Sequence, residues 1–173
     1  MSKMLICLPM IGVRMKVTLI SVGKLKERYL KEGIGEYTKR LSRFCDLQLL
    51  EVEDEQAPES LSAMQEEQVK KKEAARILSK LKDGTFLIVL DVKGEKKSSE
   101  GFASALQACF TSGKSNITFV IGGSLGLDTE LVKKADLRLS FSDMTFPHQL
   151  TRLILLEQLF RAFKIINGET YHK

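Results

Sequence analysis

Residues 117–126 read Ile-Thr-Phe-Val-Ile-Gly-Gly-Ser-Leu-Gly, an apolar run followed directly by a glycine-rich turn. The apolar part is typical of a strand that is covered on both faces of its sheet. Gly122, Gly123 and Gly126 carry no Cβ, so their backbone can turn tightly and approach a ligand closely. Ligands of open α/β sheets bind beyond the carboxyl ends of strands. The stretch therefore predicts a binding loop, and a tight turn without a ligand is the alternative.

Segments with related patterns lie on both sides of this stretch. Four further strands are predicted over residues 17–22, 47–52, 86–90 and 137–141. Helical spacing or helix-capping residues predict helices over residues 25–44, 60–81, 98–110, 128–135 and 147–168. Strands that alternate with helices predict an α/β fold, with a mainly parallel sheet and helices on both faces. The lysine-rich segment 92–98 is predicted to be an exposed loop.

Residues 1–14 are considered separately. An apolar stretch follows Lys3, but Pro9 interrupts it and no small-residue cleavage pattern comes after, which disfavours a targeting segment. Met15 and the residues after it are typical of a protein start that enters a strand. We expect residues 1–14 to be an upstream start or an expression remnant outside the fold, and residues 15–173 to form a single domain.

The net charge says little about partners. Lys3 and Arg14 belong to the first fourteen residues, and without them 25 bases remain against 22 acids, a charge of +3. That value is too small to indicate nucleic-acid binding, for which a clustered basic face is the usual sign. The acidic run 51–69 and the basic run 16–43 are interpreted as solvated faces.

The cysteines and histidines argue against a disulfide framework and a metal site. Cys7, Cys45 and Cys109 are odd in number and widely spaced, which fits a reducing cytoplasm. Only two histidines are present, His148 and His172, and no metal-ligand spacing is visible. No apolar run approaches the roughly 18 residues that a membrane span needs.

Familiar catalytic and nucleotide motifs are missing. The glycine loop lacks G-x-G-x-x-G spacing, and residues 113–115 (Gly-Lys-Ser) lack the first glycine of a P-loop, because Ala108 stands there. No G-x-S-x-G elbow exists. His148 follows Pro147 in the first turn of the last predicted helix, where the helix dipole favours a neutral imidazole. Catalysis and helix capping or packing both remain open for it.

The last predicted helix is apolar over an unusually wide part of its circumference. Its apolar positions are Leu150, Leu153, Ile154, Leu156, Leu159, Phe160, Phe163 and Ile166. Such a helix is either deeply buried in its own chain or shared with a partner. We favour the second interpretation, a dimer interface.

Four segments together resemble one family. They are residues 15–24 with Ser-Val-Gly-Lys at 21–24, the loop 119–126, the segment 141–149, and the ending from Arg161-Ala162-Phe163 to Tyr171-His172-Lys173. The chain resembles, over residues 15–173, the bacterial large-subunit rRNA pseudouridine methyltransferases, minimal members of the SPOUT class. The resemblance implies an α/β fold with a deep C-terminal trefoil knot, a homodimer, and S-adenosyl-L-methionine as methyl donor. It also implies methylation of N3 of a pseudouridine in 23S rRNA of assembled ribosomes.

The resemblance further implies site residues. The cofactor would contact Leu90, Gly122, Phe141, Ser142, Asp143, Met144, Thr145 and Phe146. His148 would contact the base or help to accept its proton. Arg152 would hold RNA phosphate or the base carbonyls, with a surface or dimer salt bridge as the alternative. Tyr171 and His172 would reach the active site through the chain terminus, possibly across the dimer, where the sequence alone indicates only an ordinary terminal segment.

Two other functions stay open. One is methylation of another RNA, such as tRNA, which would proceed on protein-free transcripts. The other is a non-catalytic ribosome-binding factor, which would bind ribosomes without the donor and tolerate substitution of Gly122.

Overall fold

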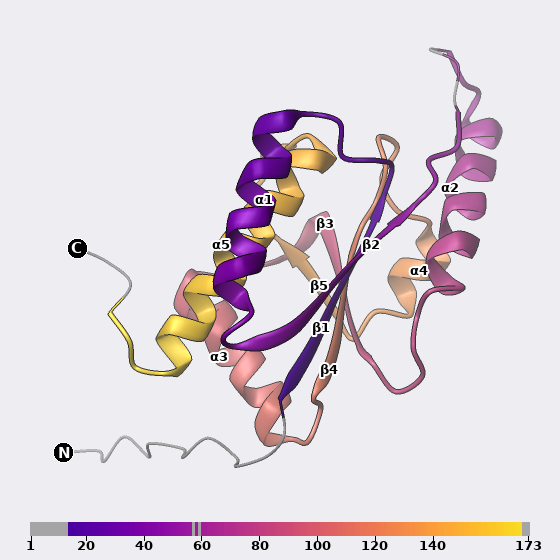
Figure 1. The fold of residues 1–173 in the computed structure, drawn as a ribbon. Coiled ribbons are helices and arrows are strands. Elements are labelled where there is room, and N and C mark those ends of the chain that lie inside the picture. Colours follow the sequence, from indigo (N-terminus) through magenta and orange to yellow (C-terminus); the bar gives the residue numbers. More distant parts are fainter. Residues whose placement is uncertain (1–13, 57, 59, 171–173) are drawn as a thin grey trace.

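The computed structural model describes residues 14–56, 58 and 60–170, which form one sheet flanked by helices (Figure 1). The sheet has the strand order β2-β1-β4-β3-β5, and every neighbouring pair is parallel. Its strands are β1 (Met15–Val22), β2 (Cys45–Val52), β3 (Phe86–Lys96), β4 (Asn116–Ile121) and β5 (Leu137–Ser140). The predicted α/β fold with a mainly parallel sheet is confirmed.

The two strands at the centre, β1 and β4, explain the apolar runs of the sequence. Every residue of β1 except Lys16, and every residue of β4 except Asn116, is buried. A strand with helices on both faces has no side that water reaches, so its sequence does not alternate. The edge strand β2 shows a mixed pattern of burial instead.

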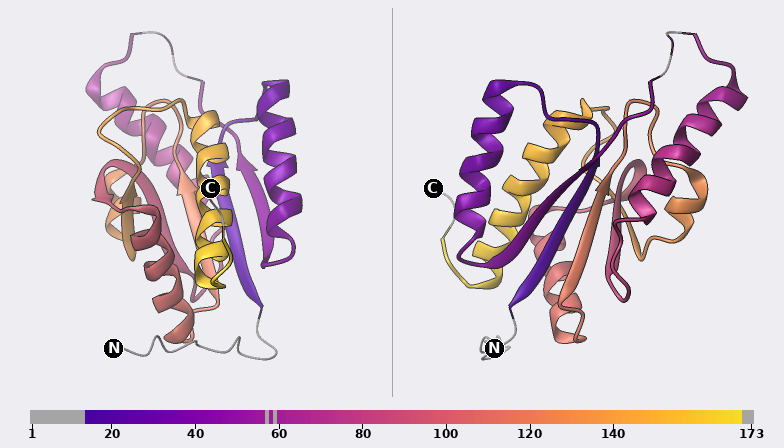
Figure 2. Two further views of the ribbon diagram at one scale, coloured as in Figure 1. Left: turned by 90° about the vertical axis from the view of Figure 1, so that its left-hand side faces the viewer. Right: turned by 45° about the vertical axis from the view of Figure 1, so that its right-hand side comes forward.

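Helices cover both faces of the sheet, as predicted (Figure 2). On one face lie α1 (Arg28–Leu41), α3 (Ser99–Thr111) and α5 (His148–Ile166), which share one apolar core. On the other face lie α2 (Ala63–Leu78) and α4 (Thr129–Lys133), which pack around a second core. Cys109 is buried in the first core, where it acts as a small apolar residue.

Three helix starts are fixed by side-chain caps. Ser62 accepts a hydrogen bond from the Gln65 N–H, and the Gln65 side chain accepts one in return from the Ser62 N–H, a complete capping box. Ser98 accepts from the Gly101 N–H. Asp128 accepts from two backbone N–H groups at the start of α4. The helix starts expected at Ser98 and Asp128 are thus confirmed.

The segment 92–98 is not the loop that the sequence predicted. The strand β3 bulges after Leu90 and rejoins β5, with Glu95 and Lys96 aligned with residues of β5. Gly94 makes this possible, because a Cβ there would lie 2.7 Å from the Arg138 carbonyl oxygen. The polar composition suggested a loop, but beyond Leu90 the strand is aligned with β5 alone and its residues are half-buried or exposed, so polar side chains are tolerated there.

The apolar stripe of the last helix is largely buried within the chain itself. The helix α5 packs against both α1 and α3, and Leu156, Leu159 and Phe163 are buried there. Phe163 also stacks on Phe44 at a centroid distance of 5.7 Å. Burial within the chain, the alternative to a dimer interface, therefore accounts for most of the stripe. In the part of the chain that the structure describes, no helix has the length and apolar character to span a bilayer.

Candidate active site

A cavity of about 600 Å³ opens at the bulge of β3 and at the carboxyl ends of β4 and β5. Three chain segments line it: Leu90 to Val92 at the bulge of β3, Ile121 to Leu127 from the end of β4 onward, and most of the segment from Leu139 to His148, from the end of β5 onward. The parallel strands bring these segments, distant in sequence, to one edge of the sheet. The volume lies within the range of small-molecule sites. Of the residues expected to hold a cofactor, all except Asp143 line this cavity.

The glycine loop folds back on itself. The Gly126 N–H donates to the Gly123 carbonyl oxygen at 3.1 Å, and Gly126 has a φ of +84°. A Cβ at Gly122 would lie 2.9 Å from the Gly126 carbonyl carbon and 3.0 Å from a Leu127 methyl carbon. The loop's own backbone therefore requires glycine at position 122, before any ligand is considered.

The segment after β5 forms the facing wall of the cavity. Ser142 organises it, since its hydroxyl accepts from the Met144 N–H at 3.1 Å and its carbonyl accepts from the Ser140 hydroxyl at 3.0 Å. Met144 is largely exposed and leaves an apolar side chain at the cavity edge. Asp143 departs from the expectation, because its carboxylate pairs with Lys96 and its side chain is 84% exposed.

His148 is the first residue of α5 and borders the cavity. A Cβ at Gly23 would lie 3.7 Å from His148 Nε2 and 3.8 Å from the Asp54 carboxyl carbon, so the imidazole and this carboxylate flank the same glycine. Burial lowers the pKa of His148 below 6.5, the Arg152 and Lys26 charges lower it further, and Asp54 opposes them. The imidazole is therefore neutral near pH 7 and able to accept a proton.

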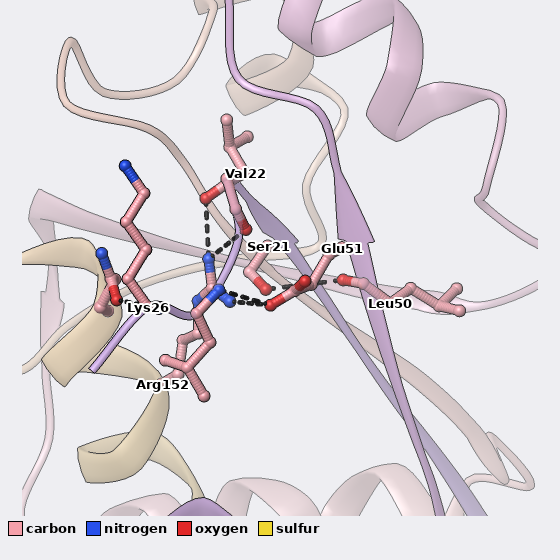
Figure 3. Close-up of polar contacts among 9 residues, drawn as sticks. Ser21, Val22, Lys26, Leu50, Glu51 and Arg152 are labelled. Atoms are coloured by element: carbon pink, nitrogen blue, oxygen red, sulfur yellow. Dashed lines mark hydrogen bonds and ion pairs between the residues drawn. The ribbon is translucent and has the colours of Figure 1, made fainter. Parts of the chain in front are cut away.

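Arg152, one turn further along α5, is only 3% exposed and points into the protein (Figure 3). One terminal nitrogen donates to Glu51 Oε1 at 2.7 Å. The other donates to the Val22 carbonyl oxygen at 2.8 Å and the Gly23 carbonyl oxygen at 2.6 Å. The guanidinium does not reach outward as a phosphate ligand would; it forms a salt bridge, though inside the chain and not at a surface.

Three acidic residues also border the site. Glu51 and Asp54 belong to the run 51–69, which was interpreted as a solvated face, and Glu73 was not among the predicted site residues. Glu51 is the last but one residue of β2 and Asp54 lies two residues after the strand, at the carboxyl end of the sheet where the cavity opens. Glu73 of α2 is 5% exposed, and a Cβ at Gly123 would lie 3.1 Å from its carboxylate. Because Glu51 lies near the end of a predicted strand, the sequence could have identified it as a site residue. No pattern among its sequence neighbours indicates that Glu73 is buried.

Two of the predicted site residues, Tyr171 and His172, lie outside the residues that the structure describes. Among the described residues, no group of three His, Cys, Asp or Glu side chains could hold a metal ion. Cys45 is the buried first residue of β2, and burial raises the pKa of its thiol to about 12, so it offers no nucleophile near pH 7.

Comparison with known proteins decides the family. A family model described as predicted SPOUT methyltransferase matches residues 15–172, nearly the whole chain. The chain belongs to the SPOUT methyltransferase family. This agrees with the resemblance seen in the sequence, and residues 1–14 lie outside the match.

Relatives of this SPOUT chain match it over their whole length. The ribosomal RNA large subunit methyltransferase H of Acetivibrio thermocellus is 66% identical over 159 residues, which cover 92% of this chain and all of the relative. The protein of the same name from Ruminiclostridium cellulolyticum is 59% identical with the same coverage. A solved structure, a probable methylase family protein from Haemophilus influenzae, matches 91% of the chain and 70% of its own length. Its TM-score is 0.50 and its identity 17%, so it supports the SPOUT fold alone.

Proposed function

We propose that this SPOUT protein transfers a methyl group from S-adenosyl-L-methionine to N3 of pseudouridine 1915 in 23S rRNA of assembled ribosomes. The observation that carries the proposal is the cavity built by the glycine loop and the segment after β5, in a chain whose whole SPOUT domain matches the family. Large-subunit rRNA as the substrate is supported by relatives, 59% and 66% identical, that are named as large-subunit rRNA methyltransferases, and the pseudouridine is the one that the family resemblance implies.

The cavity has the properties that a methyl donor of this kind requires. Glycine backbone at positions 122 and 123 and the side chains of Leu90, Met144 and Phe146 offer main-chain and apolar surface to an adenine and a ribose. These residues, with Phe141, Ser142 and Thr145, would hold the donor. S-adenosyl-L-methionine supplies an electrophilic methyl group and needs no metal. We further propose that the C-terminal segments form the trefoil knot implied by the family resemblance.

Transfer to N3 requires the loss of the proton on that nitrogen. His148 is the described residue best suited to assist, because it borders the cavity and its lowered pKa keeps it neutral at pH 7. A neutral imidazole can accept the N3 proton or a hydrogen bond from the base. We propose that Tyr171 and His172 complete the site on the substrate side.

The modest net charge of the chain favours an assembled ribosome over free RNA as the acceptor. Phosphate contacts usually dominate RNA affinity, and a chain of charge +3 without residues 1–14 is poorly equipped to bind free RNA. An assembled ribosome supplies part of the recognition surface itself, and a homodimer doubles the surface of the enzyme. We place the reaction in the cytoplasm, where assembled ribosomes are found.

The proposal is tested by following labelled methyl from S-adenosyl-L-methionine. The acceptors are ribosomes that lack the endogenous modification, free 23S rRNA, and tRNA. Label in a large-subunit pseudouridine, and only with assembled ribosomes, is the expected result. Label in tRNA would overturn the substrate and keep the enzyme class. Ribosome binding with neither label transfer nor donor binding would show a non-catalytic binding factor instead.

Removal of Tyr171 to Lys173 tests the chain terminus. We expect the truncated protein to bind S-adenosyl-L-methionine with unchanged affinity, because the donor cavity is built from residues 90–151. Methyl transfer to ribosomes should be abolished. Calorimetric titration of the donor, beside the transfer assay, separates the two effects. Normal turnover by the truncated protein would remove Tyr171 and His172 from the mechanism.

A further inference from the structure

A single buried guanidinium connects three elements that border the active site (Figure 3). Arg152 belongs to α5, its carbonyl partners Val22 and Gly23 stand at the end of β1, and its carboxylate partner Glu51 stands near the end of β2. The same Glu51 oxygen also accepts from the Leu25 N–H at 2.9 Å, which fastens the chain just after β1. The contacts of Arg152 span 101 residues of sequence to Glu51, 130 to Val22 and 129 to Gly23, so the fold alone creates them.

The two carbonyl groups that Arg152 holds belong to residues packed against the catalytic parts. Gly23 has a φ of +81° and lies against His148 Nε2. Val22 lies against the glycine loop, since a Cβ at Gly123 would be 3.1 Å from the Val22 Cγ1. Movement of the end of β1 would therefore disturb His148 on one side and the glycine loop on the other.

The contacts of Arg152 leave it poorly suited to bind the substrate directly. Both terminal nitrogens already donate inside the chain. The Nε–H is buried and has no partner among the described residues. A substrate group would have to displace Glu51 or a backbone carbonyl, and a buried charge that loses its partner is strongly destabilised.

We propose that Arg152 is a positioning residue that, together with Glu51, fixes the carboxyl end of β1 so that His148 and the glycine loop are correctly placed for methyl transfer. This inference rests on the proposed function, because it assigns a role within that reaction. Arg152 itself touches neither donor nor RNA. This indirect role differs from the direct contact with RNA phosphate or the base carbonyls that the family resemblance implies for Arg152.

The charge of Arg152 gives this role a measurable signature at His148. The charged groups that face the imidazole are Arg152 of α5, Lys26 after β1 and Asp54 after β2. Burial and the two cations lower the pKa of His148, whereas Asp54 raises it. Loss of the Arg152 charge should move this pKa up towards 6.5, and retention of the charge should not.

The experiment compares Arg152→Lys, Arg152→Gln and Glu51→Gln in the full-length protein. Arg152→Lys keeps the positive charge but cannot keep all three hydrogen bonds. Arg152→Gln removes the charge as well as the set of three hydrogen bonds. Arg28→Gln is the control, since Arg28 makes an exposed ion pair with Glu32 and does not face His148. Three measurements are made: kcat and KM for ribosomes at saturating donor, the pH profile of kcat, and the NMR titration of His148 in a His172→Gln background.

For Arg152→Lys we expect kcat to fall about tenfold to a hundredfold, as for a small displacement of reacting groups, with KM for ribosomes within about twofold. Glu51→Gln should lower kcat by about threefold to tenfold. Arg152→Gln should raise the pKa of His148 and shift the acidic limb of the profile with it, while Arg152→Lys and the control leave the titration unchanged.

Other outcomes overturn the inference. A rise in KM with unchanged kcat would show that Arg152 contacts the RNA directly. Wild-type kcat in both Arg152→Lys and Glu51→Gln would show that the network has no role in the reaction. If Arg152→Gln fails to fold, those two milder variants still decide. If the wild-type protein transfers no methyl group at all, the proposed function fails. The positioning role is contradicted separately if Arg152→Gln folds and its His148 titrates at the same pH as in the wild-type protein.

Discussion

Gly122 has no space for even a methyl side chain, because the neighbouring backbone of Gly126 occupies that space. We predict that Gly122→Ala distorts the glycine loop and weakens binding of S-adenosyl-L-methionine by at least about tenfold, equal to about 1.4 kcal/mol. Calorimetric titration of the donor measures the loss. The physical cause is a contact within the loop and not a clash with the ligand.

The control for this substitution is Gly35→Ala. Gly35 lies in the helix α1, and a Cβ there would meet nothing within 4 Å. Donor affinity should be unchanged in the control. Wild-type donor affinity in Gly122→Ala would mean that the loop can relax, or that the donor does not use it.

Glu73 gives a prediction about pH and stability. Burial is the main cause that raises the pKa of Glu73 above 4.5, helped by the neighbouring Asp54 and Glu55 carboxylates and opposed by the Glu55 N–H and Arg76. Its ionised form therefore costs free energy in the folded protein. The stability that Glu73 contributes is complete below pH 4.5 and is lost as the pH rises through the raised folded-state value.

We therefore predict that Glu73→Gln raises the free energy of unfolding at pH 7, and that its advantage shrinks as the pH falls towards about 4. The glutamine oxygen can still accept the hydrogen bond from the Glu55 N–H. Urea unfolding at several pH values measures the difference. A variant that is less stable than wild type at pH 7 would show that the carboxylate gains more from its contacts than it loses by burial.

At the scale of an element, the helix α1 contains two glycines in different surroundings. Gly35 is exposed and free of contacts, so Gly35→Ala should raise the free energy of unfolding by about 0.5–1 kcal/mol. A Cβ at Gly33 would lie 3.1 Å from a methyl carbon of Leu153 in α5. Gly33→Ala should therefore gain less than Gly35→Ala, or lose stability.

Thermal and urea unfolding of both variants test the packing of α1 on α5. Equal stabilisation by the two substitutions would show that Leu153 moves aside without cost. A larger gain at Gly33 than at Gly35 would contradict the close approach of the two helices.

At the scale of the whole molecule, the prediction concerns a dimer. Since α5 is largely buried against α1 and α3, its apolar stripe no longer requires a second chain. Apolar side chains nevertheless remain exposed beside the cavity, at Val92 and Met144. We predict a homodimer of about 39 kDa, twice the 19.5 kDa of one chain, in which these side chains are covered.

Sedimentation equilibrium measures the mass, and Met144→Glu tests the surface. The substitution should weaken the dimer and leave the unfolding free energy of the monomer almost unchanged, because the Met144 side chain is largely exposed and does not belong to the core. A wild-type mass of 19.5 kDa at micromolar concentration would contradict the prediction.

The sequence by itself determined the order of strands and helices and the edge of the sheet where the cavity lies. Apolar runs identified β1 and β4, and cap residues such as Ser98 and Asp128 marked helix starts. These signals are local: the period of the apolar residues and the chemistry of a cap are fixed by residues a few positions apart. The glycine loop was recognisable for the same reason.

Only the tertiary structure decided what the charged residues of the site contact. Arg152 lies 101 residues from Glu51 and 130 from Val22 in sequence, and no local pattern distinguishes an arginine in solvent from one buried in such contacts. The same holds for Glu73 and for the rejoining of β3 with β5. A side chain's partners depend on how distant elements pack, and packing is the product of the whole fold.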